Sequence, residues 1–234
     1  MQRYFGHKIE NNHIILDEKD YHHIKNVMRM HVGDNIECVI DNQLYLCEID
    51  TDFKVSIKEA KNQKDDKYPE IVLIIPALKE QKMDLIFQKA TELGVKGFII
   101  FPFVRSMVKI DDRKEKVKIE RWLRICKEAS EQSMRLDIPF INIEKDMDSL
   151  EKLDGLKLIC STNESKNYIK DTLKNNRDYD RIYIVVGPEG GLDLKEEKLL
   201  EQKGFKKITL GTQIMRVETV PIFLTSVIRY EYTE

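Results

Sequence analysis

The stretch VVGPEGGLD, residues 185–193, runs from an apolar strand through a glycine-rich turn into a helix. Asp193, with Glu196 three residues later, fits a capping box and predicts where that helix begins. Glycines let a backbone approach a ligand and present N–H groups to it, and α/β sheets bind ligands at their carboxyl edge. Neither familiar nucleotide loop occurs, because the chain lacks both G-x-x-x-x-G-K-[ST] and G-x-G-x-x-G. The stretch therefore predicts a ligand site, although strand-to-helix turns that bind nothing also contain glycine.

Outward from this stretch, the second part of the chain alternates between strands and helices. Several strand candidates are continuous Ile/Val/Leu runs, as expected of a parallel sheet that is covered on both faces. The alternation predicts an open, doubly wound α/β sheet. The predicted strands are residues 71–75, 97–101, 156–160, 182–186 and 207–210, and the predicted helices are residues 81–93, 115–133, 165–175, 193–203 and about 220–230.

The first part of the chain has a different pattern, in which short runs alternate between apolar and polar residues. Turn formers separate these runs, which predicts a small antiparallel β unit. Residues 18–30 interrupt it with apolar side chains at helical spacing. The polar, proline-terminated segment at residues 60–69 is expected to link two domains. The predicted strands of the first domain are residues 13–16, 35–40, 44–49 and 53–57.

The composition fits a globular protein, because 41% of the 234 residues are hydrophobic and 34% are charged. The longest apolar run, residues 71–78, contains a proline and is far shorter than the roughly 20 residues that cross a bilayer. The first residues lack the pattern of a secretory signal. The four cysteines form no C-x-x-C pair, so buried free thiols are expected. Together these features predict a cytoplasmic protein that does not contact a membrane.

All five histidines fall within the first 31 residues, a clustering that suggests a metal site. However, no cysteine or glutamate spacing around them matches a zinc pattern. The neighbours His22 and His23 would also point apart on a helix. We therefore expect no bound metal.

The net charge of −2 argues against a strongly basic nucleic-acid binder, but the charge is uneven along the chain. Residues 1–66 carry nine basic and thirteen acidic side chains, whereas residues 76–135 carry fourteen basic and nine acidic ones. A local basic surface can attract phosphates even in a slightly acidic protein. A solvated helix face explains the same pattern equally well.

A second loop candidate, LGTQIMRVET at residues 210–219, also follows a strand end and leads into a helix. Two such loops at neighbouring strand ends can form one crevice. Arg216 and Glu218 stand in an otherwise apolar segment, where charges are costly unless they are paired or used. A surface ion pair at a helix start is an equally good explanation. Pro221 fits only the first turn of the final helix.

A third segment, RWLRICKEASEQSMR at residues 121–135, has the construction of an amphipathic helix. Trp122, Ile125 and Ala129 form its apolar stripe, and its charged residues pair along the helix. Arg135 follows the stripe, and it is the residue here that we expect to contact a ligand or a phosphate.

Together, GPEGG, EASEQSMR and LG-x-x-I-x-R-x-E-T resemble the motifs of the RsmE family, the ribosomal small-subunit uridine-N3 methyltransferases of the SPOUT superfamily. The resemblance extends over nearly the whole chain and includes residues 3–5 and 23–29. It implies that residues 1–66 form a small PUA-like RNA-binding β-barrel domain. It also implies that residues 70–234 form a SPOUT-type α/β methyltransferase domain with a trefoil knot, a feature that sequence reasoning alone does not predict.

The resemblance further implies S-adenosylmethionine bound in the knot, a homodimer, and 16S rRNA within the small ribosomal subunit as the substrate. The implied cofactor-binding residues are Thr162, Gly187, Glu189, Gly190, Leu210, Gly211, Ile214, Met215 and Thr219. The implied catalytic residues are Arg135, Glu189, Arg216 and Glu218. The implied RNA-binding residues are Arg3, Arg29, Arg105 and Arg135.

The chemistry of the implied reaction explains why charged residues are needed. A uridine imide nitrogen is a poor nucleophile while it is protonated, so its proton must be removed or the resulting anion stabilised. Glu189 or Glu218 could accept the proton, and Arg135 or Arg216 could stabilise the uridine oxygen. The sequence does not choose between them. Positioning of the reactants supplies further acceleration.

The chain departs from the family pattern in one segment. Gln213 stands where an arginine is common, Met215 replaces a leucine of similar volume, and Val220-Pro221 replaces a pair of small residues. These departures motivate an alternative, a non-catalytic RNA-binding or ribosome-assembly protein that keeps the fold. A nicotinamide or ATP enzyme is a third interpretation, which the absence of both phosphate loops disfavours.

Overall fold

The computed structural model describes residues 1–63 and 68–233, and the chain divides into two compact units. The first unit comprises Met1–Asp65 together with Lys127–Ile138, and the second comprises Asp66–Cys126 together with Pro139–Glu234. Of the predicted linker, residues 60–61 belong to a strand, and residues 64–67 lie outside the described residues. No helix in the described part of the chain is long and apolar enough to span a membrane.

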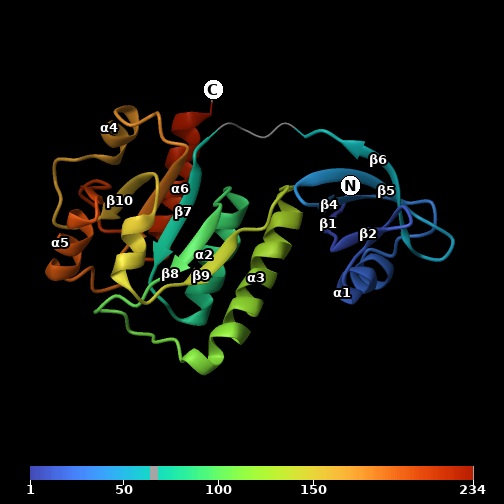
Figure 1. The fold of residues 1–234 in the computed structure, drawn as a ribbon, viewed down its shortest axis with the longest axis horizontal. Coiled ribbons are helices and arrows are strands. Elements are labelled where there is room, and N and C mark those ends of the chain that lie inside the picture. Colours follow the sequence, from blue (N-terminus) through green and yellow to red (C-terminus); the bar gives the residue numbers. More distant parts are fainter. Residues whose placement is uncertain (64–67, 234) are drawn as a thin grey trace. The chain divides into compact units, whose positions relative to one another are not determined.

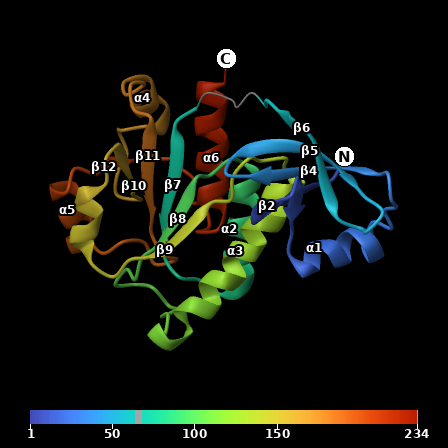
Figure 2. The ribbon, with the colours of Figure 1, turned by 45° about the vertical axis from the view of Figure 1, so that its right-hand side comes forward.

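The second unit is built on a parallel sheet of six strands (Figures 1 and 2). The strands lie in the order β12-β10-β11-β7-β8-β9, and each neighbouring pair is parallel. This arrangement confirms the predicted α/β sheet and adds one strand, β9, that the sequence pattern did not reveal. The strands are β7 (Glu70–Ile75), β8 (Gly97–Ile100), β9 (Phe140–Ile143), β10 (Leu156–Cys160), β11 (Arg181–Val186) and β12 (Lys206–Ile208).

Helices follow the strands at nearly the predicted positions. The capping box at the start of α5 is present, because the Asp193 side chain accepts from the helix backbone and the Glu196 carboxylate accepts from the Asp193 N–H. The helices of this unit are α2 (Glu80–Glu92), α3 (Glu115–Gln132, whose last turns belong to the first unit), α4 (Ile169–Lys174), α5 (Leu194–Gln202) and α6 (Thr219–Tyr232). Two short 3₁₀ segments, η2 (Asp112–Lys114) and η3 (Met147–Lys152), complete the set.

Helix α4 begins four residues later than predicted, and Glu164 supplies the reason. Its carboxylate accepts hydrogen bonds from the backbone N–H groups of residues 165, 166 and 167, at 2.8, 2.7 and 3.2 Å. These bonds close a turn that competes with the helix. Tyr168 then bridges to Thr209, so the helix starts at Ile169.

The core of this unit lies on both faces of the sheet. On one face, Val72 and Val185 pack in a buried cluster with Leu200 of α5. On the other face, Phe98 meets Phe87 of α2, with 4.8 Å between the ring centroids. Burial on both faces explains why the strands read as continuous apolar runs rather than as alternating ones.

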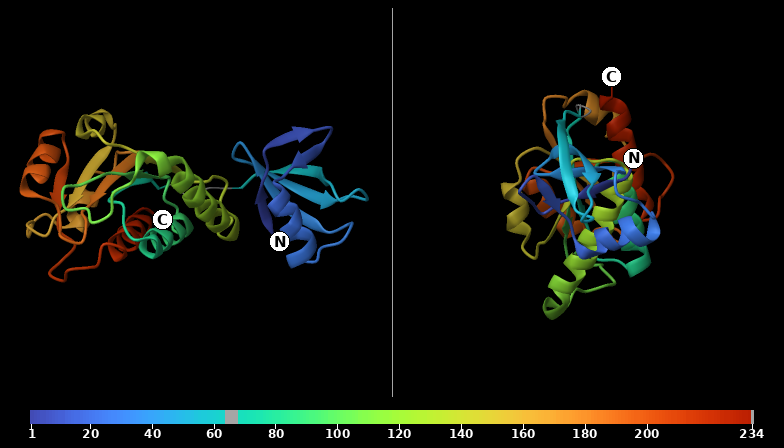
Figure 3. Two further views of the ribbon diagram at one scale, coloured as in Figure 1. Left: turned by 90° about the horizontal axis from the view of Figure 1, so that it is seen from below. Right: turned by 90° about the vertical axis from the view of Figure 1, so that its right-hand side faces the viewer.

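The first unit contains a curved sheet (Figure 3). Its six strands lie in the order β1-β4-β5-β6-β3-β2. Its pairs are antiparallel except β1–β4, which is parallel, so the prediction of a purely antiparallel unit is wrong in this one pair. The predicted helix is present as α1 (Glu18–His22) continued by the π-helical η1 (His23–Val27). The strands are β1 (Arg3–Phe5), β2 (Lys8–Glu10), β3 (His13–Ile15), β4 (Asn35–Ile40), β5 (Gln43–Ile49) and β6 (Val55–Lys61).

Buried charges attach residues 127–138 to the strands of the first unit. Arg3, only 3% exposed, donates to Glu37 at 2.7 Å, to the Arg135 carbonyl at 3.2 Å and to the Met134 carbonyl. Lys127 donates to Asp20 at 2.8 Å and to a second carboxylate on its own helix. The family resemblance implies RNA contact for Arg3, and this role stays a prediction. The hydrogen bonds of its buried guanidinium give Arg3 a structural role within this unit.

Candidate functional site

A cavity of about 720 Å³ opens where three neighbouring strands, β12, β10 and β11, reach their carboxyl ends. The loops after these strands enclose it, as expected for ligand sites in parallel sheets. Both loops that the sequence analysis singled out therefore border a single cavity. Its lining includes residues 160–162, 164–165, 168, 186–189, 191–192, 209–217 and 220, together with Lys82 and Glu197.

The glycine-rich turn is held tightly from several directions. A side chain at Gly187 would place its Cβ 3.0 Å from the Leu192 backbone nitrogen, so a larger residue would push the turn outward. Arg105 donates to the carbonyls of Gly190 and Leu192, at 2.9 and 3.3 Å. Arg105, which the sequence assigned to RNA, thus fixes this turn, and its side chain remains 47% exposed.

The loop after β12 offers an apolar, open wall. Gly211 has φ +114°, a conformation that other residues rarely adopt, and no atom lies within 4 Å of where its Cβ would be. Ile214 lines the same cavity and is 85% exposed, which is unusual for so apolar a side chain. An exposed apolar side chain beside open backbone is the kind of surface on which a flat ring can pack.

Lys82, near the start of α2, connects the two loops. Its ammonium lies 3.0 Å from Glu189 of the glycine-rich turn and 3.1 Å from Glu218, which precedes α6. Hydrogen bonds to these carboxylates raise the pKa of Lys82. Burial raises the pKa of Glu218, but a backbone hydrogen bond and the charges of Lys82 and Arg216 hold it below its ordinary value. The site therefore contains an ammonium between two carboxylates.

Deeper in the cavity, a buried polar pair supports its wall. The Ser161 hydroxyl donates to the Glu197 carboxylate at 2.8 Å, and Glu197 is 3% exposed. Beside it, burial raises the pKa of the Cys160 thiol to about 12. Because the thiolate is the reactive form, this cysteine is not a nucleophile.

The structure brings most of the implied cofactor residues to this one cavity. Glu218 pairs with Lys82, which lines the cavity. Arg216 also lines the cavity, and it forms no ion pair within the described residues. Gly190 and Thr219 are not among its described lining residues. The implied residues that do line it are Thr162, Gly187, Glu189, Leu210, Gly211, Ile214 and Met215.

The remaining predicted arginines belong to the first unit. Arg135 forms an ion pair with Asp137 at 2.9 Å, and its side chain is 11% exposed. Arg29 follows η1, has φ +53° and is exposed to solvent. Of the predicted RNA-binding arginines in this unit, Arg3 and Arg135 are largely buried, whereas Arg29 is exposed to solvent.

Sequence reasoning missed Lys82, although its ammonium joins the two motif loops. Lys82 is one of two lysines on an amphipathic helix far from both loop motifs in the chain, so no local signal distinguishes it. Ser161 and Tyr168 were missed for a similar reason, because only the strand order brings them beside the two loops.

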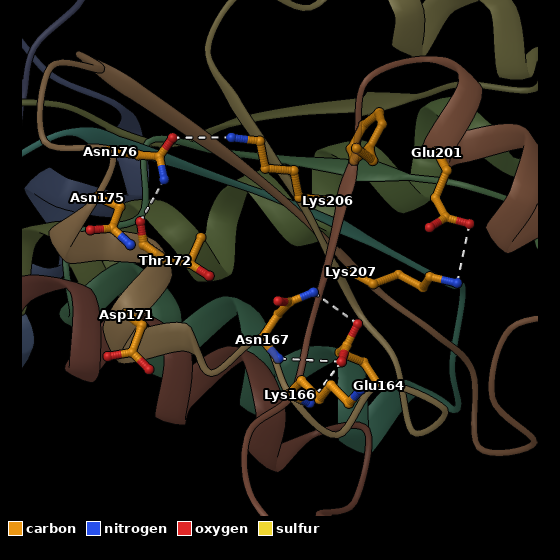
Figure 4. Close-up of a pocket in the computed structure, with 11 residues that line it drawn as sticks. Glu164, Lys166, Asn167, Asp171, Thr172, Asn175, Asn176, Glu201, Lys206 and Lys207 are labelled. Carbon is orange, nitrogen blue, oxygen red and sulfur yellow. Dashed lines mark hydrogen bonds and ion pairs between the residues drawn. The ribbon is translucent and has the colours of Figure 1, made fainter.

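A second cavity of about 510 Å³ lies between α4 and the end of α5 (Figure 4). Its lining is polar and balanced in charge, with three lysines facing three acidic residues. Lys206 donates to Asn176 at 3.1 Å, and Lys207 pairs with Glu201 at 3.1 Å. Since these lysines already have partners, this cavity is the weaker candidate for binding a ligand.

Metal-ligating side chains do not gather in the described part of the chain. Within residues 1–63 and 68–233, no group of three or more His, Cys, Asp or Glu side chains is arranged to hold a metal ion. The candidate site is therefore built from the backbone loops and the charged groups described above.

Comparison with known proteins gives a family. The RNA methyltransferase domain family matches residues 65–229, and the RNA methyltransferase PUA domain family matches residues 16–54. The chain is 36% identical to ribosomal RNA small subunit methyltransferase E of Bacillus subtilis, covering 91% of this chain and 88% of that protein. It is 35% identical to the protein of the same name from Mesomycoplasma hyopneumoniae, covering 96% and 97%.

Solved structures agree with this result. The ribosomal RNA small subunit methyltransferase E of Neisseria gonorrhoeae, bound to S-adenosylmethionine, superimposes with a TM-score of 0.87 at 25% identity, covering 99% of this chain and 98% of that chain. A putative methyltransferase of Legionella pneumophila, in complex with the same cofactor, gives 0.85 at 26% identity, covering 98% and 97%. The present chain belongs to the ribosomal RNA small subunit methyltransferase E family.

Proposed function

We propose that this chain transfers a methyl group from S-adenosylmethionine to N3 of a uridine in 16S rRNA, using the cavity between the loops after β10, β11 and β12. Membership of the family makes it an S-adenosylmethionine-dependent rRNA methyltransferase. The observation that carries the proposal is the single cavity into which both motif loops and the Lys82 bridge converge.

The residues of the cavity fit S-adenosylmethionine. A volume of about 720 Å³ lies within the range of small-molecule sites. Leu210, Ile214 and Met215 offer apolar surface to an adenine ring, and the open backbone at Gly211 lets a ligand approach closely. When bound, the cofactor supplies an electrophilic methyl group on a sulfonium.

The charged residues at the site suit the chemistry of a uridine imide. The N3 proton has to leave for the nitrogen to become a good nucleophile, and a carboxylate is a suitable acceptor. Glu218 is 14% exposed, and its lowered pKa keeps it ionised at neutral pH. Glu189, which pairs with the same lysine, is the second possible acceptor of the proton. Arg216, which also faces Glu218, is suited to hold a phosphate or a uridine oxygen.

Several finer features belong to this proposal. We infer that residues 1–66 are the PUA-like RNA-binding domain, with Arg29 contributing to phosphate contact. We infer equally that residues 70–234 are the methyltransferase domain with a trefoil knot through the loop after β12. The protein would act in the cytoplasm as a homodimer on the small ribosomal subunit.

The test is methyl transfer from labelled S-adenosylmethionine to small subunits that lack this modification, followed by nuclease digestion and mass spectrometry of the nucleosides. We expect 3-methyluridine as the labelled product. Transfer to another base or to another RNA would contradict the assigned substrate. Absence of both transfer and cofactor binding in a calorimetric titration would favour the non-catalytic alternative, which the departures at Gln213 and Val220-Pro221 motivate.

A further inference from the structure

Lys82 is the cation that the site holds between its two carboxylates, and it has no role in the reaction as proposed so far. Its side chain is 28% exposed and lines the cavity. Glu189 and Glu218, its two partners, come from the two loops that enclose the cavity.

The geometry leaves part of the ammonium available. A protonated lysine has three N–H donors. Glu189 accepts a hydrogen bond from one of them at 3.0 Å, Glu218 lies at ion-pair distance, 3.1 Å, and no other partner for Lys82 occurs within the described residues. The third N–H is therefore free to bond a group that enters the cavity.

We propose that Lys82 is a catalytic residue, which donates its third N–H to a carbonyl oxygen of the target uracil and stabilises the anion formed when N3 loses its proton. This inference rests on the function proposed above. It assigns to a lysine, rather than to an arginine, the task of stabilising the oxygen.

In this step N3 loses a proton to a carboxylate and gains the methyl group. The N3 proton passes to the carboxylate of Glu218 or Glu189, and the negative charge spreads from N3 onto the neighbouring carbonyl oxygens. The N3 electron pair forms the bond to the methyl carbon while the carbon–sulfur bond breaks, and the electron pair of that bond remains on sulfur as a neutral thioether. Lys82 stays protonated throughout and gives up no proton.

The charges around Lys82 support this role. Hydrogen bonds to Glu189 and Glu218 raise the pKa of Lys82, so it carries its charge at neutral pH. Arg216 also acts on Glu218, so loss of Lys82 leaves Glu218 with a weaker cationic influence rather than with none. An ammonium held in place by two carboxylates needs little reorganisation as charge develops on the substrate.

The experiment compares Lys82→Met with Lys89→Met. Lys89 lies on the same helix and pairs with Glu92 at 2.9 Å, and it does not line the cavity. Each variant is assayed on small subunits reconstituted with uridine or with 5-fluorouridine, whose N3 proton is more acidic because fluorine withdraws electrons. Lys82→Arg, which keeps the charge, is included, and thermal midpoints confirm that each variant folds.

With uridine, we expect Lys82→Met to lower kcat by about 100-fold, as for loss of one donor to a developing oxyanion. Lys89→Met should leave kcat unchanged, and Lys82→Arg should restore much of the loss. With 5-fluorouridine, the loss in Lys82→Met should shrink by about 10-fold or more, because a more stable anion needs less help. If Lys82→Met does not fold, Lys82→Gln takes its place.

Two results would overturn the inference. One is an unchanged kcat in Lys82→Met. The other is a loss that is equal for uridine and 5-fluorouridine, because a lysine that merely joins the loops would impair both substrates alike. Failure of the wild-type enzyme to form 3-methyluridine would instead overturn the proposed function, and the two failures are thus distinguishable.

Discussion

Glu218 shows how the surroundings of one residue prepare it for chemistry. Its side chain is 14% exposed, and burial alone would raise the pKa of its carboxyl group. Lys82 and Arg216 act in the opposite direction, so the pKa of Glu218 falls below its ordinary value. A folded-state pKa that is lowered means that the group is ionised at neutral pH and becomes protonated only as the pH falls through that value.

We expect Glu218→Gln to lower kcat by about 100-fold or more, because a glutamine cannot accept the N3 proton. The wild-type rate should fall as the pH drops through the lowered pKa of Glu218, and this acid limb should be missing from the profile of the variant. Glu189→Gln, at a side chain that is 40% exposed, is the matched comparison and should cost less. A larger loss in Glu189→Gln would make that residue the base.

A comparison of Arg3 with Arg29 separates the contribution of an arginine to stability from its contribution to RNA binding. Arg3→Met leaves Glu37, whose side chain is 15% exposed, without its cation, and removes the donor to two carbonyls, so we expect a loss of about 3 kcal/mol in the free energy of unfolding. Arg29→Met removes an exposed charge and should change that free energy by no more than about 0.5 kcal/mol.

RNA binding should show the opposite order. Arg29→Met should weaken binding to small-subunit rRNA and reduce the dependence of log K on log salt by about one. Denaturant unfolding and filter binding measure the two effects. A stable Arg3→Met variant with weakened, less salt-dependent binding would return Arg3 to the RNA surface.

At the scale of the elements, the loops at the ends of β11 and β12 carry the site, and their glycines do not all act in the same way. Gly211 and Gly204 both have φ near +100°, at 114° and 87°, and neither has an atom within 4 Å of the position that a Cβ would occupy. Gly211 lines the cavity, whereas Gly204 follows the end of α5 outside it.

We expect Gly211→Ala and Gly204→Ala to destabilise the protein similarly, by about 1 kcal/mol, because each forces alanine into a strained conformation. Only Gly211→Ala should also weaken S-adenosylmethionine binding, by about 10-fold, since its methyl group enters the cavity and its backbone shifts. Thermal unfolding and calorimetric titration measure these effects. Equal cofactor affinity in the two variants would move the cofactor away from the loop after β12.

How far the elements could be predicted depended on their length. The longer helices and the buried strands of the second unit were predicted to within a few residues, since their apolar runs and caps are local signals. Strands β1, β2 and β9, of three or four residues, were not predicted, because so short a run carries little periodicity, although β3 and β12 of similar length were predicted. The start of α4 was missed because the Glu164 side chain captures three backbone N–H groups, a competition that propensity does not register.

At the scale of the whole molecule, the chain folds as two units, and one of them takes in a segment from the middle of the sequence. Residues 127–138 belong to the first unit, where Arg3 donates to the carbonyls of Met134 and Arg135 and Asp20 pairs with Lys127. A division of the sequence into two uninterrupted domains cannot show this, since the contacts join residues more than one hundred positions apart.

Prediction of the site from the sequence was limited in the same way, because some of its residues are far apart in the chain. Both motif loops could be predicted, because glycine, a strand end and a capping box are neighbours in the sequence. Lys82 could not, because only the packing of α2 beside the carboxyl ends of the strands brings it between Glu189 and Glu218. The trefoil knot stays a prediction of the family resemblance.

Hydrogen–deuterium exchange with and without S-adenosylmethionine tests the location of the site most directly. We expect the cofactor to slow exchange in residues 186–192 and 209–217, which enclose the larger cavity, and to leave residues 171–176 and 201–207 of the smaller one unchanged. Protection confined to the smaller cavity, or no protection at saturating cofactor, would contradict the assignment of the two motif loops as the cofactor site.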